Sequence, residues 1–146
     1  VLHDVGRIHQ RPGHAAISKS IVADWLKENR QITERIIEPS RLLRMIESHS
    51  DKEVTDDDFL QRVLKDGDVL DEIGVMSIFM ASNWIERDNP YFFTLLKERV
   101  ETKELDFCDQ GFQLLQTEGA KQLLRQKRAF IAQFCSQLGD ELEGTE

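Results

Sequence analysis

Apolar residues recur at helical spacing along most of this 146-residue chain. Ile17, Ile21 and Trp25 follow one another every four residues, and residues 123–138 carry a similar apolar stripe. This period places the apolar side chains on one face of an α-helix. No stretch alternates apolar and polar residues as a half-buried strand would, and no hairpin dipeptide separates two apolar runs. The pattern predicts an all-α fold, an orthogonal bundle of six or seven helices.

Turn and capping residues divide the chain into the expected helices. His14 begins the first one, and Pro39 with Ser40 precedes a second over about residues 41–49. The hydroxyl and carboxylates of residues 55–58 suit a helix start, and they lack the spacing of a calcium-binding EF-hand. Residues 75–86 are strongly apolar and predict a central, mostly buried helix. Later helices are expected over residues 91–100, over 107–115 after a short polar linker, and from 117 onwards.

Composition and net charge argue against several classes of function. The net charge of −8 argues against a surface that binds nucleic-acid polymers or anionic membranes, and no apolar run approaches the roughly 18 residues of a membrane span. The two cysteines form no CxxC motif, so a cytoplasmic location is predicted. The chain opens without an initiator Met or a helix cap. We therefore expect a missing N-terminal segment and a single domain, residues 1–146, that is N-terminally incomplete.

Histidines and an aspartate stand at the edges of the first expected helices. His3 and Asp4 are adjacent, and imidazole and carboxylate are ligands that zinc, manganese, iron and cobalt accept. His14 fits either a solvated helix-start residue or a site residue. His49 ends a helix on its apolar side, which is typical of a core or C-capping histidine and is also compatible with a functional role.

Two of the carboxylates within residues 66–74 are expected near the apolar face of a helix. Asp68 is four residues from Leu64, and Asp71 is three beyond Asp68, so both fall on or beside the apolar face of a helix. A carboxylate that faces a core is costly unless it is paired or bound to a cation. The sequence leaves two alternatives open, a cap for the next segment and a partner for a metal or a cluster of His and Arg.

Four sequence blocks follow one another along the chain. They are His3-Asp4-Val5-Gly6-Arg7, His14 at the start of a helix, Ile46-x-x-His49-Ser50, and Asp66-Gly67-Asp68-x-Leu70-Asp71-x-x-Gly74. In this order, the blocks resemble the HD-domain phosphohydrolase superfamily, specifically the small stand-alone bacterial members that include nucleoside triphosphate pyrophosphohydrolases. Residues 114–118, followed by Lys127, Arg128 and Phe130, are similar to the final helix of that family. The resemblance covers nearly all of the chain and implies an orthogonal bundle of the HD-domain type.

The resemblance also implies a metal site. His3 and Asp4 would be metal ligands, Asp68 would close the site from a later helix, and His49 would bind a second metal or a phosphate. The family's remaining ligand, a histidine on an earlier helix, is expected upstream of Val1. The ion would be a divalent metal, namely manganese, iron, zinc, cobalt, nickel or magnesium.

Further roles follow from the same resemblance. Arg7 would neutralise developing charge, His14 would lie on the substrate side or behind a ligand, and Asp71 would orient a ligand or a water. His49 or His14 would protonate the leaving oxygen. The implied activity is hydrolysis of a phosphomonoester or phosphoanhydride, with a nucleotide as the favoured substrate, through a metal-activated water. A homodimer is left open.

Two positions depart from the family pattern. Val69 and Met80 stand where the small phosphohydrolases carry cations, which weakens the case for a triphosphate substrate. An alternative is therefore a non-catalytic regulatory module that binds a metal or a nucleotide. A purely structural helical bundle is a third interpretation.

Overall fold

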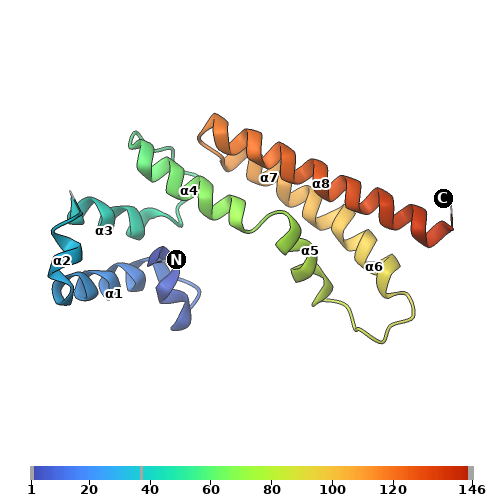
Figure 1. Cartoon of the computed structure of the whole chain (residues 1–146), viewed down its shortest axis with the longest axis horizontal. Coiled ribbons are helices and arrows are strands. Elements are labelled where there is room, and N and C mark those ends of the chain that lie inside the picture. The colour runs from blue at the N-terminus through green and yellow to red at the C-terminus, as the bar shows by residue number, and fades with distance from the viewer. Residues whose placement is uncertain (1, 37, 145–146) are drawn as a thin grey trace. The chain divides into compact units, whose positions relative to one another are not determined.

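The computed structural model describes residues 2–36 and 38–144, and within these ranges every regular element is a helix (Figure 1). The predicted all-α class is confirmed, whereas the HD-type bundle stays a prediction. The chain divides into two compact units, with the boundary between Lys65 and Asp66. The expected single domain stays a prediction.

The described residues of the first unit form four helices and the start of a fifth. They are the 3₁₀ helix η1 (Leu2–Ile8), α1 (His14–Glu28), α2 (Arg30–Thr33), α3 (Pro39–Ser48) and the first part of α4 (Phe59–Asp71). Both η1 and α3 pack against α1. A small core of Val22, Leu26 and Ile46 joins α1 to α3, and partly buried apolar residues, including Val5 of η1, pack around it.

The second unit is built on a helical hairpin. Its elements after α4 are α5 (Val75–Ser82), α6 (Phe92–Arg99), the π-helix η2 (Val100–Glu104), α7 (Leu105–Leu114) and α8 (Glu118–Glu143). In Figure 1, α6 and α7 follow one line and α8 runs back alongside them. The core between these helices includes Val100, Cys108, Leu124 and Ile131. The polar linker expected after residue 100 is wrong, because η2 continues α6 directly into α7.

The side chain of Asp66, within α4, binds the backbone at the start of α8. Only 2% of this residue is exposed, and its carboxylate accepts hydrogen bonds from the amides of Gln116 and Thr117, both at 2.8 Å. The Thr117 hydroxyl donates a third bond, at 2.6 Å, to the same carboxylate. A buried carboxylate needs such donors. Asp66 of the Asp-Gly-Asp block is therefore a structural residue in this fold.

The expected buried helix over residues 75–86 is wrong in its length and in its burial. The helix α5 ends at Ser82, and its Val75, Met76, Phe79 and Met80 are exposed by half or more. A largely apolar helix is buried only where other elements pack against it. Here the buried face carries Ser77, Ile78 and Ala81.

Candidate metal centre

Asp4, His14 and His49 meet in the first unit. Oδ1 of Asp4 lies 3.0 Å from Nε2 of His14 and 3.3 Å from Nε2 of His49, and the two Nε2 atoms are 3.1 Å apart. His49 is fully buried, and His14 is 8% exposed. The interpretation of His14 as a solvated helix-start residue is therefore wrong. The three side chains come from η1, from the first residue of α1 and from the residue that caps α3.

The other nitrogen of each imidazole faces a backbone carbonyl. Nδ1 of His14 is 2.8 Å from the oxygen of Arg11, and Nδ1 of His49 is 2.6 Å from the oxygen of Ile46. A carbonyl can only accept a hydrogen bond, so each Nδ1 carries the hydrogen. In the neutral ring, Nε2 then presents a lone pair. Two lone pairs and the Asp4 carboxylate thus point at one small volume, which must contain a proton or a cation.

The three ligand atoms have the spacing of one metal's coordination shell. An ion with bonds of about 2.0–2.1 Å holds adjacent ligand atoms roughly 2.9 Å apart in an octahedron and roughly 3.4 Å apart in a tetrahedron. The separations of 3.0, 3.1 and 3.3 Å fall within this range. Histidines that donate their second N–H to a backbone carbonyl are also typical of metal ligands. The donor set fits, and this group could hold a metal ion.

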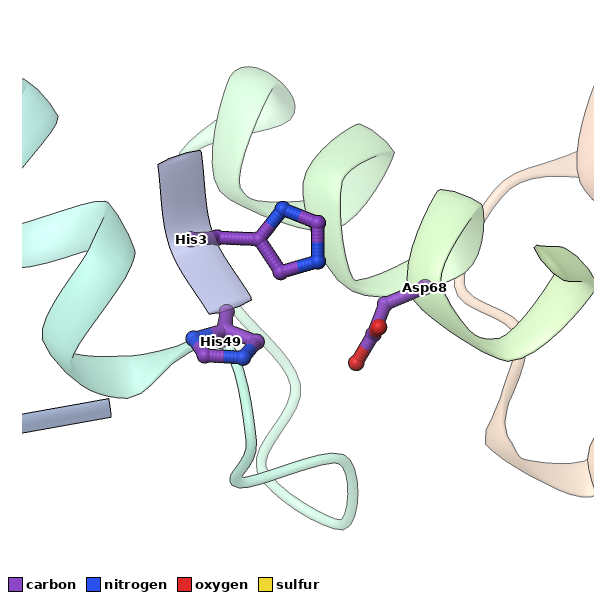
Figure 2. A group of neighbouring side chains, drawn as sticks. All are labelled: His3, His49 and Asp68. Atoms are coloured by element: carbon purple, nitrogen blue, oxygen red, sulfur yellow. The ribbon is translucent and has the colours of Figure 1, made fainter. Parts of the chain in front are cut away.

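His3 and Arg7 surround the outer oxygen of Asp4. Nε of Arg7 lies 3.0 Å from Oδ2 of Asp4, and Nε2 of His3 lies 3.8 Å from the same oxygen. The His3 ring meets the His49 ring edge to face, with centroids 4.8 Å apart, and Figure 2 shows these two side chains next to each other. Arg7 therefore holds one oxygen of Asp4 and leaves the other to His14 and His49.

A close backbone approach positions η1. The amide of Gly6 donates a hydrogen bond of 2.8 Å to the hydroxyl of Ser18, which is fully buried on α1. A Cβ atom at Gly6 would collide with the carbonyl oxygen of His14. Only glycine allows this contact. The Gly of the His-Asp-x-Gly block therefore sets the distance between Asp4 and His14.

His14 was expected to lie on the substrate side or behind a ligand, and its ring lies directly against Asp4. The loop that precedes α1 brings this about, because Gly13 adopts the left-handed conformation with φ of 74° and turns the chain so that the Arg11 carbonyl meets the His14 ring. The Pro-Gly turn before His14 was the available signal. This dipeptide predicts a tight turn, but it does not predict which nitrogen of the His14 ring contacts the backbone of that turn.

The two expected carboxylates of the later block lie on α4. Asp68, also labelled in Figure 2, is partly buried and belongs to the second unit, so its role as a ligand stays a prediction. Asp71 ends α4 and is exposed, and its carboxylate therefore does not face the core. Its expected role in orienting a ligand or a water also stays a prediction.

The positions that depart from the family pattern have different environments. Val69 is 9% exposed and belongs to the core of the second unit. A cation there would require charge within that core. Met80 is 62% exposed on α5, so its surroundings would accept a polar side chain.

No protein-family model, curated protein or solved structure matches this chain. The resemblance to HD-domain phosphohydrolases thus depends on the sequence blocks alone. Among the helices of the described residues, none has both the length and the apolar character that a bilayer crossing requires.

Proposed function

We propose that this chain is a divalent-metal-dependent phosphohydrolase that acts on a phosphomonoester or phosphoanhydride, with a nucleotide as the favoured substrate class. The observation that carries the proposal is the convergence of Asp4 Oδ1, His14 Nε2 and His49 Nε2 within 3.3 Å of one another. The order of the HD-type blocks supports the phosphoryl chemistry. Both cysteines are free and buried, which fits the predicted cytoplasmic location.

Asp4, His14 and His49 would hold the ion. His3 and Asp68 are the further ligands that the resemblance implies. When bound, the ion would supply a Lewis acid for a phosphoryl oxygen and would activate a water molecule for attack.

Arg7 is the residue we assign to the substrate charge. Its side chain is 44% exposed, and Nε holds Asp4. A guanidinium is planar and has five N–H donors, a geometry that suits phosphoryl oxygens. Such contacts strengthen as negative charge develops in the transition state.

We assign His14 and His49 to the ion in preference to the leaving group. Each ring uses Nδ1 on a backbone carbonyl and turns Nε2 toward Asp4. Neither ring then has a nitrogen available to protonate a leaving oxygen. The proton would come from another donor, and Asp71 keeps its proposed role in orienting a water.

Hydrolysis of p-nitrophenyl phosphate and of a panel of nucleotides, with several divalent ions, tests this function. Asp4→Asn and His14→Gln should each lower the metal-dependent rate by about 100-fold or more, because even residues behind the ligands can cost that much. His9→Gln is the matched control, since His9 is exposed on the loop before α1. Equal rates for the wild type, Asp4→Asn and His14→Gln would refute the proposal.

A second candidate is a regulatory module that binds a metal or a nucleotide without turnover. Val69, buried in the second unit's core where the related enzymes carry a cation, favours it. A nucleotide that raises the melting temperature, with no product released in the presence of metal, would select this function over the enzyme.

A further inference from the structure

A pocket in the second unit has the character of a binding site. It is an open depression of about 440 Å³ between the end of α5 and the junction of α6 with η2, and Trp84, Arg99 and Lys103 line it. Trp84 is 76% exposed, and the guanidinium carbon of Arg99 lies 5.3 Å from the centre of its ring system. Arg99 covers one face of the indole, and a ligand in the pocket could stack on the other.

Arg99 carries an unsatisfied donor. Its Nε is buried and has no hydrogen-bond partner among the residues that the structure describes. Buried polar atoms without partners are rare, and a charged donor left without an acceptor is costly. The charge of this guanidinium is therefore incompletely compensated, and a carboxylate or phosphate in the pocket would offset it through two parallel hydrogen bonds.

The backbone around this pocket is also unusual. Lys103 belongs to the π-helix η2, which starts directly after Arg99. Such π-helical turns are rare and occur frequently at functional sites. Lys103 follows Arg99 by four residues, so the two cations are neighbours along the helix surface.

The pocket does not attract anions through an excess of positive charge. Glu86 and Glu98 also line it, and their charges balance those of Arg99 and Lys103. Recognition would therefore depend on local contacts, a hydrogen bond to Arg99 and stacking on Trp84, more than on net charge.

We propose that this pocket binds a small molecule that joins a flat aromatic ring to a phosphate or carboxylate group. The ring stacks on Trp84, and the anion binds the guanidinium of Arg99. The site shares no residue with the candidate metal centre, so it does not depend on the proposed hydrolase activity.

Tryptophan fluorescence tests this site directly. The chain has two tryptophans, and Trp25→Phe leaves Trp84 as the only one. This variant is titrated with adenosine monophosphate, adenosine and inorganic phosphate in the presence of a chelator, which prevents metal-dependent hydrolysis. Adenosine monophosphate should quench the emission in a saturable manner, and adenosine should bind at least about tenfold more weakly because it lacks the charged partner of Arg99.

Variants of Arg99 separate charge from hydrogen bonding. Arg99→Gln and Arg99→Lys, in the Trp25→Phe background, should both weaken the binding of adenosine monophosphate by about tenfold or more, since neither keeps the planar guanidinium. Arg125→Gln is the matched control, because Arg125 lies 5.0 Å over the Phe112 ring in the same unit but does not line this pocket. Circular dichroism confirms that each variant keeps its helices.

Three results would overturn the proposal. They are no saturable quenching by adenosine monophosphate, equal binding of adenosine and adenosine monophosphate, and unchanged affinity in both folded Arg99 variants.

Discussion

His14 and His49 face each other through Nε2 atoms that are 3.1 Å apart, while Nδ1 of each ring is held by a backbone carbonyl. These carbonyl contacts fix the rings so that both lone pairs turn toward the carboxylate of Asp4. The arrangement is repulsive unless a positively charged species lies among the three groups. It is therefore the feature of this molecule that most favours a bound cation.

Gly6→Ala should destabilise the chain and displace η1. The new Cβ would collide with the His14 carbonyl oxygen and would lie 2.8 Å from the Ser18 amide. Overpacking of this kind costs about 1–3 kcal/mol, because the buried backbone of α1 cannot move away easily. Urea unfolding measures the loss.

Gly67→Ala is the matched control for Gly6→Ala. A Cβ at Gly67, within α4, meets no atom of the described residues within 4 Å. Alanine should raise the unfolding free energy by about 0.5–1 kcal/mol, since glycine is a poor residue inside a helix. Equal effects of the two substitutions would contradict the close approach of η1 to α1.

Asp66→Asn should destabilise the second unit by about 1–3 kcal/mol, because the amide group cannot accept all the bonds that Gln116 and Thr117 donate. Asp88→Asn, at an exposed turn position, is the control and should change stability by less than about 0.5 kcal/mol. Thermal and urea unfolding measure both effects. An unchanged midpoint for Asp66→Asn would show that this carboxylate does not hold the start of α8.

Asp58 should make stability depend on pH under acidic conditions. Its two oxygens bind Arg41 at 2.6 and 2.7 Å, and this ion pair lowers the pKa of Asp58 to about 2. A carboxyl group with a lowered pKa stabilises the folded state above its unfolded pKa of about 3.9. The contribution is then lost as the pH falls from about 4 through 2.

Urea unfolding of the wild type and Asp58→Asn at several pH values isolates this ion pair. The difference in unfolding free energy should be constant above about pH 5 and should shrink toward pH 2. A difference that stays the same down to pH 2 would be inconsistent with the lowered pKa.

The thiol of Cys108 should be inert in the folded protein. Cys108 is 1% exposed, and burial raises its pKa to about 11. Little reactive thiolate is therefore present near pH 8. Reaction with a disulfide reagent should be slow for the native protein and fast in urea, whereas rapid native labelling of Cys108 would contradict its burial.

Helical spacing predicted the class of the fold and the approximate place of most helices, because an apolar period of three to four residues is typical of a helix. Ile17, Ile21 and Trp25 lie within α1, but they were wrong as its buried face. Trp25 is 38% exposed, and the buried apolar residues of α1 are Ala15, Val22 and Leu26. The same reasoning failed for α5, since an apolar run indicates that a helix can be buried but not how much of it its neighbours cover. It also missed η2, where polar residues continue a helix that composition alone favours as a linker.

Only part of the candidate site could be predicted from the sequence. His3, Asp4 and His49 could be named from their place in motif blocks. The contact of His14 with Asp4 could not, because it depends on the backbone turn at Gly13 and on the approach of Gly6 to α1. Asp66 was missed as a structural residue for a related reason, since its partners lie 50 and 51 residues away in the chain.

Calorimetric titration with manganese or zinc, after treatment with a chelator, tests the central claim most directly. The wild type and His9→Gln should bind at least one ion per chain with equal affinity. Asp4→Asn and His14→Gln should each lower that affinity by about tenfold or more, because each removes one converging ligand atom. Equal affinities across all four proteins, or no binding by the wild type, would contradict a metal centre at Asp4, His14 and His49.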